Sequence, residues 1–155
     1  MRPRSLGRRL ALQYLFMADL NGFSGVESPE DFFRGQRLAE RRESGGDDWD
    51  DDGASGEEAS RRPEAEAFAL LLIRGVEDNL EAIDREIAAS ADNWSLIRIA
   101  PIERNVIRLA AAELRLGASP RRVALDEAVE LAKRFGDKDS GAFVNGVADR
   151  LFGGT

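Results

Sequence analysis

Four arginines within the first nine residues could bind an anion such as phosphate: Arg2, Arg4, Arg8 and Arg9. A guanidinium donates paired hydrogen bonds to a phosphate, and it can also stack on an unpaired base. Two plainer explanations stay open. The arginines could form a solvated basic helix face, or they could reflect a general preference for arginine, because only Lys133 and Lys138 are lysines.

A second group of candidate residues follows the polar turn at 136–139. Phe143 continues an apolar helical period, so it is either a core residue or a ring exposed enough to stack on a base. Asp139 can favour the start of the next helix through its negative charge. We expect Asn145 to bond the local backbone and Gly146 to permit the close approach of another helix.

These side chains need helices to hold them, and the apolar spacing predicts an all-α fold. One helical pattern ends at Phe135 with Gly136 as its cap, and Ser140 is predicted to cap the next. Pro101 suits the first turn of a helix that runs towards Gly117. Further helical periods lie near residues 8–20, 29–38 and 64–90. No segment shows the sustained two-residue alternation of a strand.

Residues 38–63 interrupt the helical patterns with glycines and charges. They include eight acids between positions 43 and 58, without which the net charge of −7 would become +1. Such a segment buries too little apolar surface to offset its ordering entropy, so we expect a disordered acidic loop. Asp48, Asp50 and Asp52 open like a calcium loop, but the twelfth position is Ala59 where a glutamate is required. A solvated acidic loop is the better interpretation.

Composition argues against an enzyme. The chain has no histidine and no cysteine, so it lacks the commonest general base and the thiolate nucleophile, and the absence of cysteine suits a reducing cytoplasm. No phosphate-binding glycine loop or nucleophile-elbow motif is present, and nothing calls for a metal or cofactor. Arg8 and Arg9 before an apolar run superficially suggest an export signal, but Gln13 and Asp19 break that run. No run approaches the ~20 apolar residues of a membrane span.

Four blocks of the sequence together resemble the NusB family of bacterial transcription antitermination factors. They are Arg8–Phe16, Gly75-Val76 with Ile83-Asp84, the central stretch from Trp94 to Leu114, and the turn with Phe143 and Asn145-Gly146. They follow the family's order and cover most of residues 1–23 and 66–152. The resemblance implies one NusB-like domain over 1–155, an all-α bundle of about seven helices in two packed subdomains, about 1–90 and 91–155.

The resemblance also implies a function and a site. Family members pair with NusE, a small-subunit ribosomal protein, and bind boxA-type single-stranded RNA in nascent ribosomal transcripts, together with RNA polymerase and other Nus factors. Asp139 then lies at the RNA edge, where a carboxylate can accept hydrogen bonds from base amino groups. The expected RNA-binding residues are Arg4, Arg8, Arg9, Asp139 and Phe143. The expected partner-binding residues are Glu103 and Arg104.

The chain departs from the family pattern in the acidic insert, in Gly141-Ala142 before Phe143, and in Leu6-Gly7, which thin the N-terminal basic cluster. Two other functions stay open. One is a protein-interaction module of the same fold that does not bind RNA. The other is the helical domain that precedes a ribosomal RNA cytosine methylase, which would need a further Rossmann-like domain that this sequence does not contain. Trp94 is expected to be a core or interhelix anchor.

Overall fold

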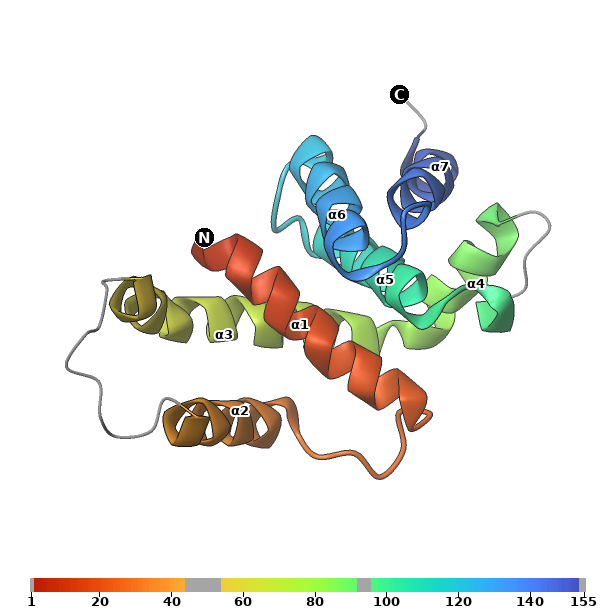
Figure 1. Cartoon of the computed structure of the whole chain (residues 1–155). Coiled ribbons are helices and arrows are strands. Elements are labelled where there is room, and N and C mark those ends of the chain that lie inside the picture. Colours follow the sequence, from red (N-terminus) through yellow and green to blue (C-terminus); the bar gives the residue numbers. More distant parts are fainter. Residues whose placement is uncertain (1, 44–53, 92–95, 154–155) are drawn as a thin grey trace.

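The computed structural model describes residues 2–43, 54–91 and 96–153. Over these residues the chain forms seven α-helices, a short 3-10 helix and no strand (Figure 1), so the predicted all-α fold class is confirmed. The elements are α1 (Pro3–Leu20), α2 (Pro29–Glu43), α3 (Ala54–Asp78), α4 (Leu80–Ser90), η1 (Leu96–Arg98), α5 (Pro101–Leu116), α6 (Arg121–Phe135) and α7 (Ser140–Phe152).

Local sequence signals determine several helix ends. Pro3 and Pro101 open α1 and α5, where the missing backbone N–H of proline costs nothing. α5 ends at Leu116 and is capped by Gly117, whose φ of 63° is left-handed and therefore favours glycine. The amides of Gly117 and Ala118 donate to the carbonyls of Leu114 and Glu113, which is the Schellman pattern. These boundaries agree with the predicted ones.

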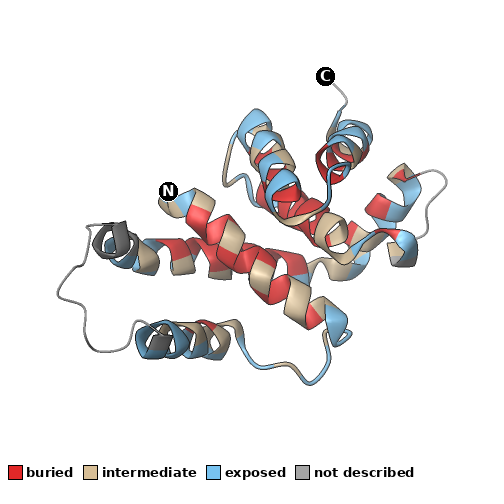
Figure 2. Cartoon of the chain, viewed as in Figure 1, coloured by how far each residue is buried: buried red, intermediate tan, exposed pale blue. Residues whose placement is uncertain are grey.

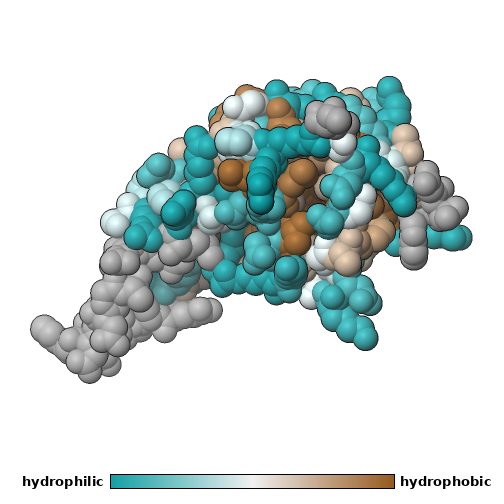
Figure 3. Space-filling model, turned by 90° about the horizontal axis from the view of Figure 1, so that it is seen from above, coloured by the Kyte–Doolittle hydropathy of each residue, from teal (hydrophilic) through white to brown (hydrophobic). Residues whose placement is uncertain are grey.

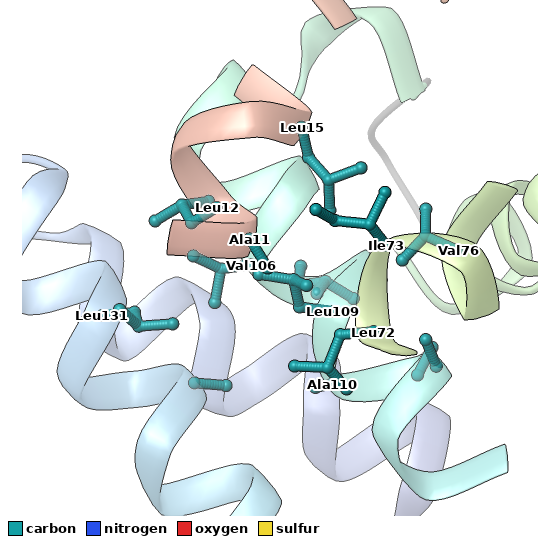
Figure 4. Packing of buried hydrophobic residues seen from close by; sticks show 14 of the residues in the cluster. Ala11, Leu12, Leu15, Leu72, Ile73, Val76, Val106, Leu109, Ala110 and Leu131 are labelled. Atoms are coloured by element: carbon teal, nitrogen blue, oxygen red, sulfur yellow. The ribbon is translucent and has the colours of Figure 1, made fainter. Parts of the chain in front are cut away.

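The core is built where α1 packs along both α3 and α5. Figure 4 shows Leu15 of α1 beside Ile73 of α3, and Leu12 of α1 facing Val106 of α5 and Leu131 of α6. Buried positions follow the inner sides of α1, α3 and α5, whereas α2 and α7 show broad exposed surfaces (Figure 2). Each large apolar side chain buried there stabilises the fold by about 1.5–3 kcal/mol.

Aromatic side chains attach the first turns of α2 to the core. Phe33 is fully buried, and the ring of Phe32 meets Tyr14 of α1 edge-on, with ring centroids 5.4 Å apart. The Tyr14 hydroxyl donates to the carbonyl oxygen of Glu27, 2.9 Å away, in the chain segment that enters α2. This anchoring holds α2 beside α3 along the lower edge of the molecule in Figure 1.

The predicted disordered loop at 38–63 is wrong at both of its ends, because α2 continues to Glu43 and α3 begins at Ala54. Polar side chains stabilise these helix ends in place of apolar ones. Arg62 of α3 forms ion pairs with Glu40 of α2 and with Glu66, one helical turn further along α3. Pro63 lies inside α3, so proline did not end the helix there. Residues 44–53, with the weak calcium-loop match, lie outside the described residues.

The helical period predicted over 64–90 is divided between two helices. α3 ends at Asp78 and α4 begins at Leu80, and the side-chain amide of Asn79 donates to the carbonyl oxygen of Gly75 at 3.0 Å. None of the described helices is both long and apolar enough to cross a bilayer. The proposed division into subdomains near residue 90 stays a prediction; what the structure adds is that α1 contacts helices from both halves.

Candidate functional site

The N-terminal arginines do not form one basic cluster, because α1 divides them between two faces. Arg4 and Arg8, one helical turn apart, both lie near the Phe68 ring of α3, with guanidinium carbons 5.0 and 5.4 Å from its centroid. Arg9 points elsewhere, with its guanidinium carbon 6.0 Å from the ring centroid of Phe135 at the end of α6. Neighbouring positions in the sequence therefore serve different parts of the molecule.

Arg8 is buried and fully engaged. Its Nε and Nη2 donate to one carboxylate oxygen of Glu113 on α5, at 2.8 and 2.5 Å, and Nη2 also reaches the Ser119 hydroxyl at 3.3 Å. Only 5% of the Arg8 side chain and 2% of the Glu113 side chain are exposed. A phosphate could reach this guanidinium only by breaking a buried ion pair. The expectation that Arg8 contacts RNA therefore does not fit its place in the fold, where it ties α1 to α5.

Arg4 is exposed, but it also forms hydrogen bonds within the fold. Its Nη1 donates to the carbonyl oxygen of Ala118 at 2.6 Å and to the Ser119 hydroxyl at 3.2 Å, so it holds the connection between α5 and α6. Its remaining N–H groups are directed to no acceptor among the described residues, which leaves room for a phosphate contact. Arg4 combines a structural contact with an accessible charge.

Arg9 has the least engaged guanidinium of the three. It is half-buried beside Phe135, and it forms no ion pair with any residue that the structure describes. Its Nε is buried without a hydrogen-bond acceptor in the same part of the chain. An unsatisfied buried donor costs about 1–3 kcal/mol, so a ligand oxygen that lets this side chain reorient would relieve a real cost.

The turn between α6 and α7 differs from its predicted geometry. Ser140 is the first residue of α7 and is buried, while Asp139 occupies the N-cap position. The Ser140 hydroxyl accepts from the Asp137 amide at 2.9 Å and donates to the Asp137 carboxylate at 3.2 Å, so it closes the turn instead of capping α7. The prediction of Ser140 as the N-cap is wrong because its side chain bonds backwards to Asp137.

Asp139 is exposed and makes no side-chain hydrogen bond to the start of α7. Capping through a hydrogen bond is thus excluded, although a charge near a helix start still contributes favourably. The exposed carboxylate is open to an external hydrogen-bond donor. This position is compatible with the expected contact to base amino groups.

Phe143 lies at the edge of the core, and its stacking on a base stays a prediction. It is half-buried and packs against the core from the first turn of α7. The close helix approach that was expected at Gly146 occurs at Gly141 instead. A Cβ at Gly146 would meet nothing within 4 Å, whereas a Cβ at Gly141 would lie 2.7 Å from Cγ of Lys133 on α6. Gly141, not Gly146, is where α7 approaches another helix closely, and Asn145 beside Gly146 is exposed.

The two predicted partner-binding residues differ in how far the fold itself engages their side chains. Arg104 donates twice to the Asp19 carboxylate of α1, at 2.9 and 2.6 Å, and also to the carbonyl oxygens of Leu96 and Ile99. It therefore joins α1, η1 and α5, and that structural use does not fit the expected partner contact. Glu103 is half-exposed in the first turn of α5. Trp94 lies outside the described residues.

An apolar pocket that the sequence analysis did not foresee lies among α1, the start of α5 and the end of α6. It has a volume of about 170 Å³ and is lined by Leu12, Gln13, Phe16, Ile102 and Phe135. The stripe Arg9, Gln13 and Phe16 at helical spacing was visible in the sequence, but its opposite wall comes from residues about 90 to 120 positions further on. Glu103 follows Ile102 directly, and Asp139 comes four residues after Phe135.

Arg134 places an exposed guanidinium near the end of α6. The guanidinium carbon of Arg134 lies 5.6 Å from the Phe135 ring centroid, and Arg134 is exposed without an ion pair among the described residues. Seen from above, where α6 and α7 face the viewer, apolar side chains are visible in the middle of the molecule and hydrophilic ones surround them (Figure 3). No group of three or more metal-binding side chains occurs within the described ranges.

The helical bundle, with half-buried aromatic side chains and basic side chains on its surface, defines a class of small all-α proteins. The comparisons with known proteins specify it. The family model of the NusB family matches residues 6–152. The transcription antitermination protein NusB of Sorangium cellulosum is 42% identical over 152 residues, covering 97% of this chain and 92% of that protein.

Solved structures agree with this relation. The NusB structure of T. maritima matches with a TM-score of 0.71 and 32% identity, covering 99% of this chain and 94% of that one. A crystal structure of the antitermination factors NusB and NusE in complex with double-stranded RNA matches with a TM-score of 0.70 and 27% identity, over 100% and 99% of the two chains. The chain belongs to the NusB family of transcription antitermination factors.

Proposed function

We propose that this protein is a non-catalytic, cytoplasmic RNA-binding factor that pairs with NusE and binds boxA-type single-stranded RNA in nascent ribosomal transcripts. The complex would then join RNA polymerase and other Nus factors to suppress termination. The observation that carries this proposal is the match, over the whole chain, to a NusB structure that holds both NusE and double-stranded RNA.

The positions of the described side chains support a separate role for each in binding RNA or the protein partner. Arg9 and the free N–H groups of Arg4 would bind phosphates, while Phe143 would stack on a base and Asp139 would accept from a base amino group. Glu103, half-exposed at the start of α5, would face the protein partner. Arg8 and Arg104 would act indirectly, because their ion pairs hold α1 in place.

The physical basis would be avidity. One of the expected basic RNA contacts, Arg8, is held in a buried ion pair inside the fold, so the RNA affinity of the protein alone would be modest. A partner that adds adjacent RNA contacts raises the effective concentration of each surface for the other. The same reduction in free cations also favours the second candidate function, a protein-interaction module of the same fold that does not bind RNA.

The test is a titration of fluorescently labelled boxA RNA with the protein, with and without NusE, at several salt concentrations. We expect binding that is tighter with NusE, weaker on a scrambled RNA of equal length, and weaker as salt rises because phosphate contacts release counterions. Arg85→Ala, which removes an exposed charge on α4, serves as a control for the loss of one positive charge. NusE binding without any RNA binding would establish the protein-interaction module instead.

A further inference from the structure

The apolar packing of α2 stops well before the helix ends. Phe33 is fully buried, but none of residues 34–42 is buried, and Leu38, the one large apolar side chain among them, is 50% exposed. On the facing part of α3, residues 59–64 are exposed or half-buried, and burial begins at Ala65. Residues 34–42, called the α2 arm below, therefore lie beside α3 without a share in the hydrophobic core (Figure 2).

Polar side chains hold the α2 arm against α3. Arg62 of α3 donates to the side-chain oxygen of Gln36 at 3.1 Å and to the Glu40 carboxylate at 3.3 Å. Arg62 also donates to Glu66 on its own helix at 3.0 Å, and Arg37 of the arm forms an ion pair with the same carboxylate. The Arg62 side chain is only 12% exposed, so it is the centre of this cluster, whereas its partner Glu40 is 63% exposed.

Both helices are weakened at the level where the core ends. Gly35 follows Phe33 by two residues, and a Cβ at this position would meet nothing within 4 Å, so no close contact requires a glycine. Glycine inside a helix is destabilising because its backbone has more freedom to lose. Pro63 precedes Ala65 by two residues and has no backbone N–H, so the helical hydrogen bond to the Ala59 carbonyl cannot form.

The balance of forces differs between the arm and the core. Ion pairs with an exposed partner contribute little to stability, whereas each large apolar side chain in the core contributes more. Segments with few buried apolar contacts open locally at a lower free energy than the whole fold. A glycine at the base of the arm lowers the cost of opening further, because the helix is easier to interrupt there.

We propose that the α2 arm opens away from α3 while the core stays folded, and that the ion-pair cluster around Arg62 controls this opening. Salt screens charges and therefore favours the open state. Opening also breaks the hydrogen bond from the side-chain amide of Gln36 to the Gln13 oxygen of α1, now 2.8 Å long, so the state of the arm reaches α1. This device is independent of the proposed binding of RNA and NusE.

The experiment is amide hydrogen exchange of the full chain, at a pH where exchange follows the opening equilibrium, in about 0.05 M and about 1 M NaCl. We expect the amides of residues 36–42 to exchange on the order of ten-fold faster in high salt, while those of 10–15 in α1 stay unchanged. Arg62→Met should give fast exchange of the arm at both salt concentrations. Gly35→Ala should slow exchange of the arm by about two- to five-fold.

Two further variants guard the interpretation. Arg85→Ala removes an exposed ion pair with Glu81 at the same helical spacing as Arg62 and Glu66, and should leave exchange of the arm at the wild-type rate. If Arg62→Met speeds exchange in α1 as well, it has weakened the whole fold. Glu40→Gln then decides, because it removes one exposed partner of Arg62 and should still speed exchange of the arm alone.

Three results would overturn the proposal. The first is exchange of residues 36–42 as slow as that of α1 at both salt concentrations, because the arm would then open only when the whole protein unfolds. The second is a wild-type rate and salt response in Glu40→Gln, which would show that the ion pairs do not hold the arm. The third is unprotected exchange of the arm in low salt, which would mean that no closed state exists to be controlled.

Discussion

The two faces of α1 use the same kinds of residue for opposite purposes. On the inner face, Gly7, Arg8 and Tyr14 are buried, and each meets a partner from another part of the chain. On the outer face, Arg9 and Phe16 are half-buried beside a pocket, and Arg9 lacks an acceptor for its Nε. A residue type therefore does not decide between structure and recognition; what decides is whether another helix supplies the partner.

The comparison is tested most strongly by removing the arginine of the inner face. Arg8→Ala leaves the Glu113 carboxylate buried without its counter-charge, and breaking such a pair costs about 3–5 kcal/mol. We expect a loss of that size in the free energy of unfolding, measured in urea. A variant of wild-type stability that has lost RNA binding would mean that Arg8 faces RNA and that the two faces of α1 are not distinct.

Tyr14 makes the stability that the inner face contributes depend on pH. Burial, helped by the negative charge of Glu77, raises the pKa of Tyr14 to about 12, from an ordinary value near 10. Because the folded state holds the proton more tightly, this stabilisation is complete below pH 10 and is lost as pH rises from 10 through 12. The difference between the two pKa values corresponds to at most ~2.7 kcal/mol in the free energy of unfolding.

Tyr14→Phe should remove this dependence on pH between 10 and 12. The sequence contains one tyrosine, so tyrosinate absorbance reports this phenol alone. Ionisation near pH 10 in the folded protein would show that the hydroxyl is not held on the inner face as described.

Substitutions at two glycines compare a closely packed position with an open one. At Gly7 a Cβ would lie 2.7 Å from the backbone oxygen of Ala65, so α1 and α3 would have to separate. We expect Gly7→Ala to destabilise the fold by about 1–3 kcal/mol. Gly146→Ala, with open space around it, should instead stabilise α7 by about 0.5–1 kcal/mol. Thermal or urea unfolding measures both, and equal effects would refute the assignment of Gly7 to a close helix contact.

A substitution on the outer face of α1 should change RNA binding and leave the stability of the fold nearly unchanged. Arg9→Ala removes a cation without an ion pair in the described chain, so unfolding should change by less than about 1 kcal/mol. RNA affinity should fall, and the slope of log affinity against log salt should decrease in size by about one. An unchanged salt slope would exclude a phosphate contact at Arg9.

Asp139→Asn is expected to have the smallest effect. The side chain makes no capping hydrogen bond, so stability should stay at the wild-type value. In the NusE complex, the ratio of affinities for boxA and scrambled RNA should fall by about three-fold, as for one ordinary hydrogen bond. An unchanged ratio would remove Asp139 from base recognition and leave it the role of a favourable charge at the start of α7.

Much of the fold could be predicted because its signals are local. Proline in a first helical turn and glycine in a left-handed cap act within a few residues, as Pro101 and Gly117 do at the ends of α5. The prediction failed at 38–63 because helix formation there draws on ion pairs between α2 and α3, such as Arg62 with Glu40. Apolar periodicity does not register such contacts.

The candidate site was predicted less well than the fold. Sequence reasoning named Arg9, Asp139 and Phe143, and these side chains remain accessible, but it grouped Arg8 with Arg9 and took Arg104 for a binding residue. It missed the pocket because each wall, read alone, is an ordinary apolar helix position. Leu12 and Phe135 look like core residues until the end of α6 is placed beside α1.

The amino-acid sequence by itself determined the helical class, most helix boundaries and membership of the NusB family, since these depend on short-range patterns and on ordered blocks of residues. Only the tertiary structure decided which of Arg8 and Arg9 stabilises the fold. Arg8 meets Glu113, which is 105 positions away in the chain, while Arg9 meets the ring of Phe135. Two adjacent guanidiniums with the same chemistry differ because helix geometry turns one towards a buried carboxylate and the other towards the surface.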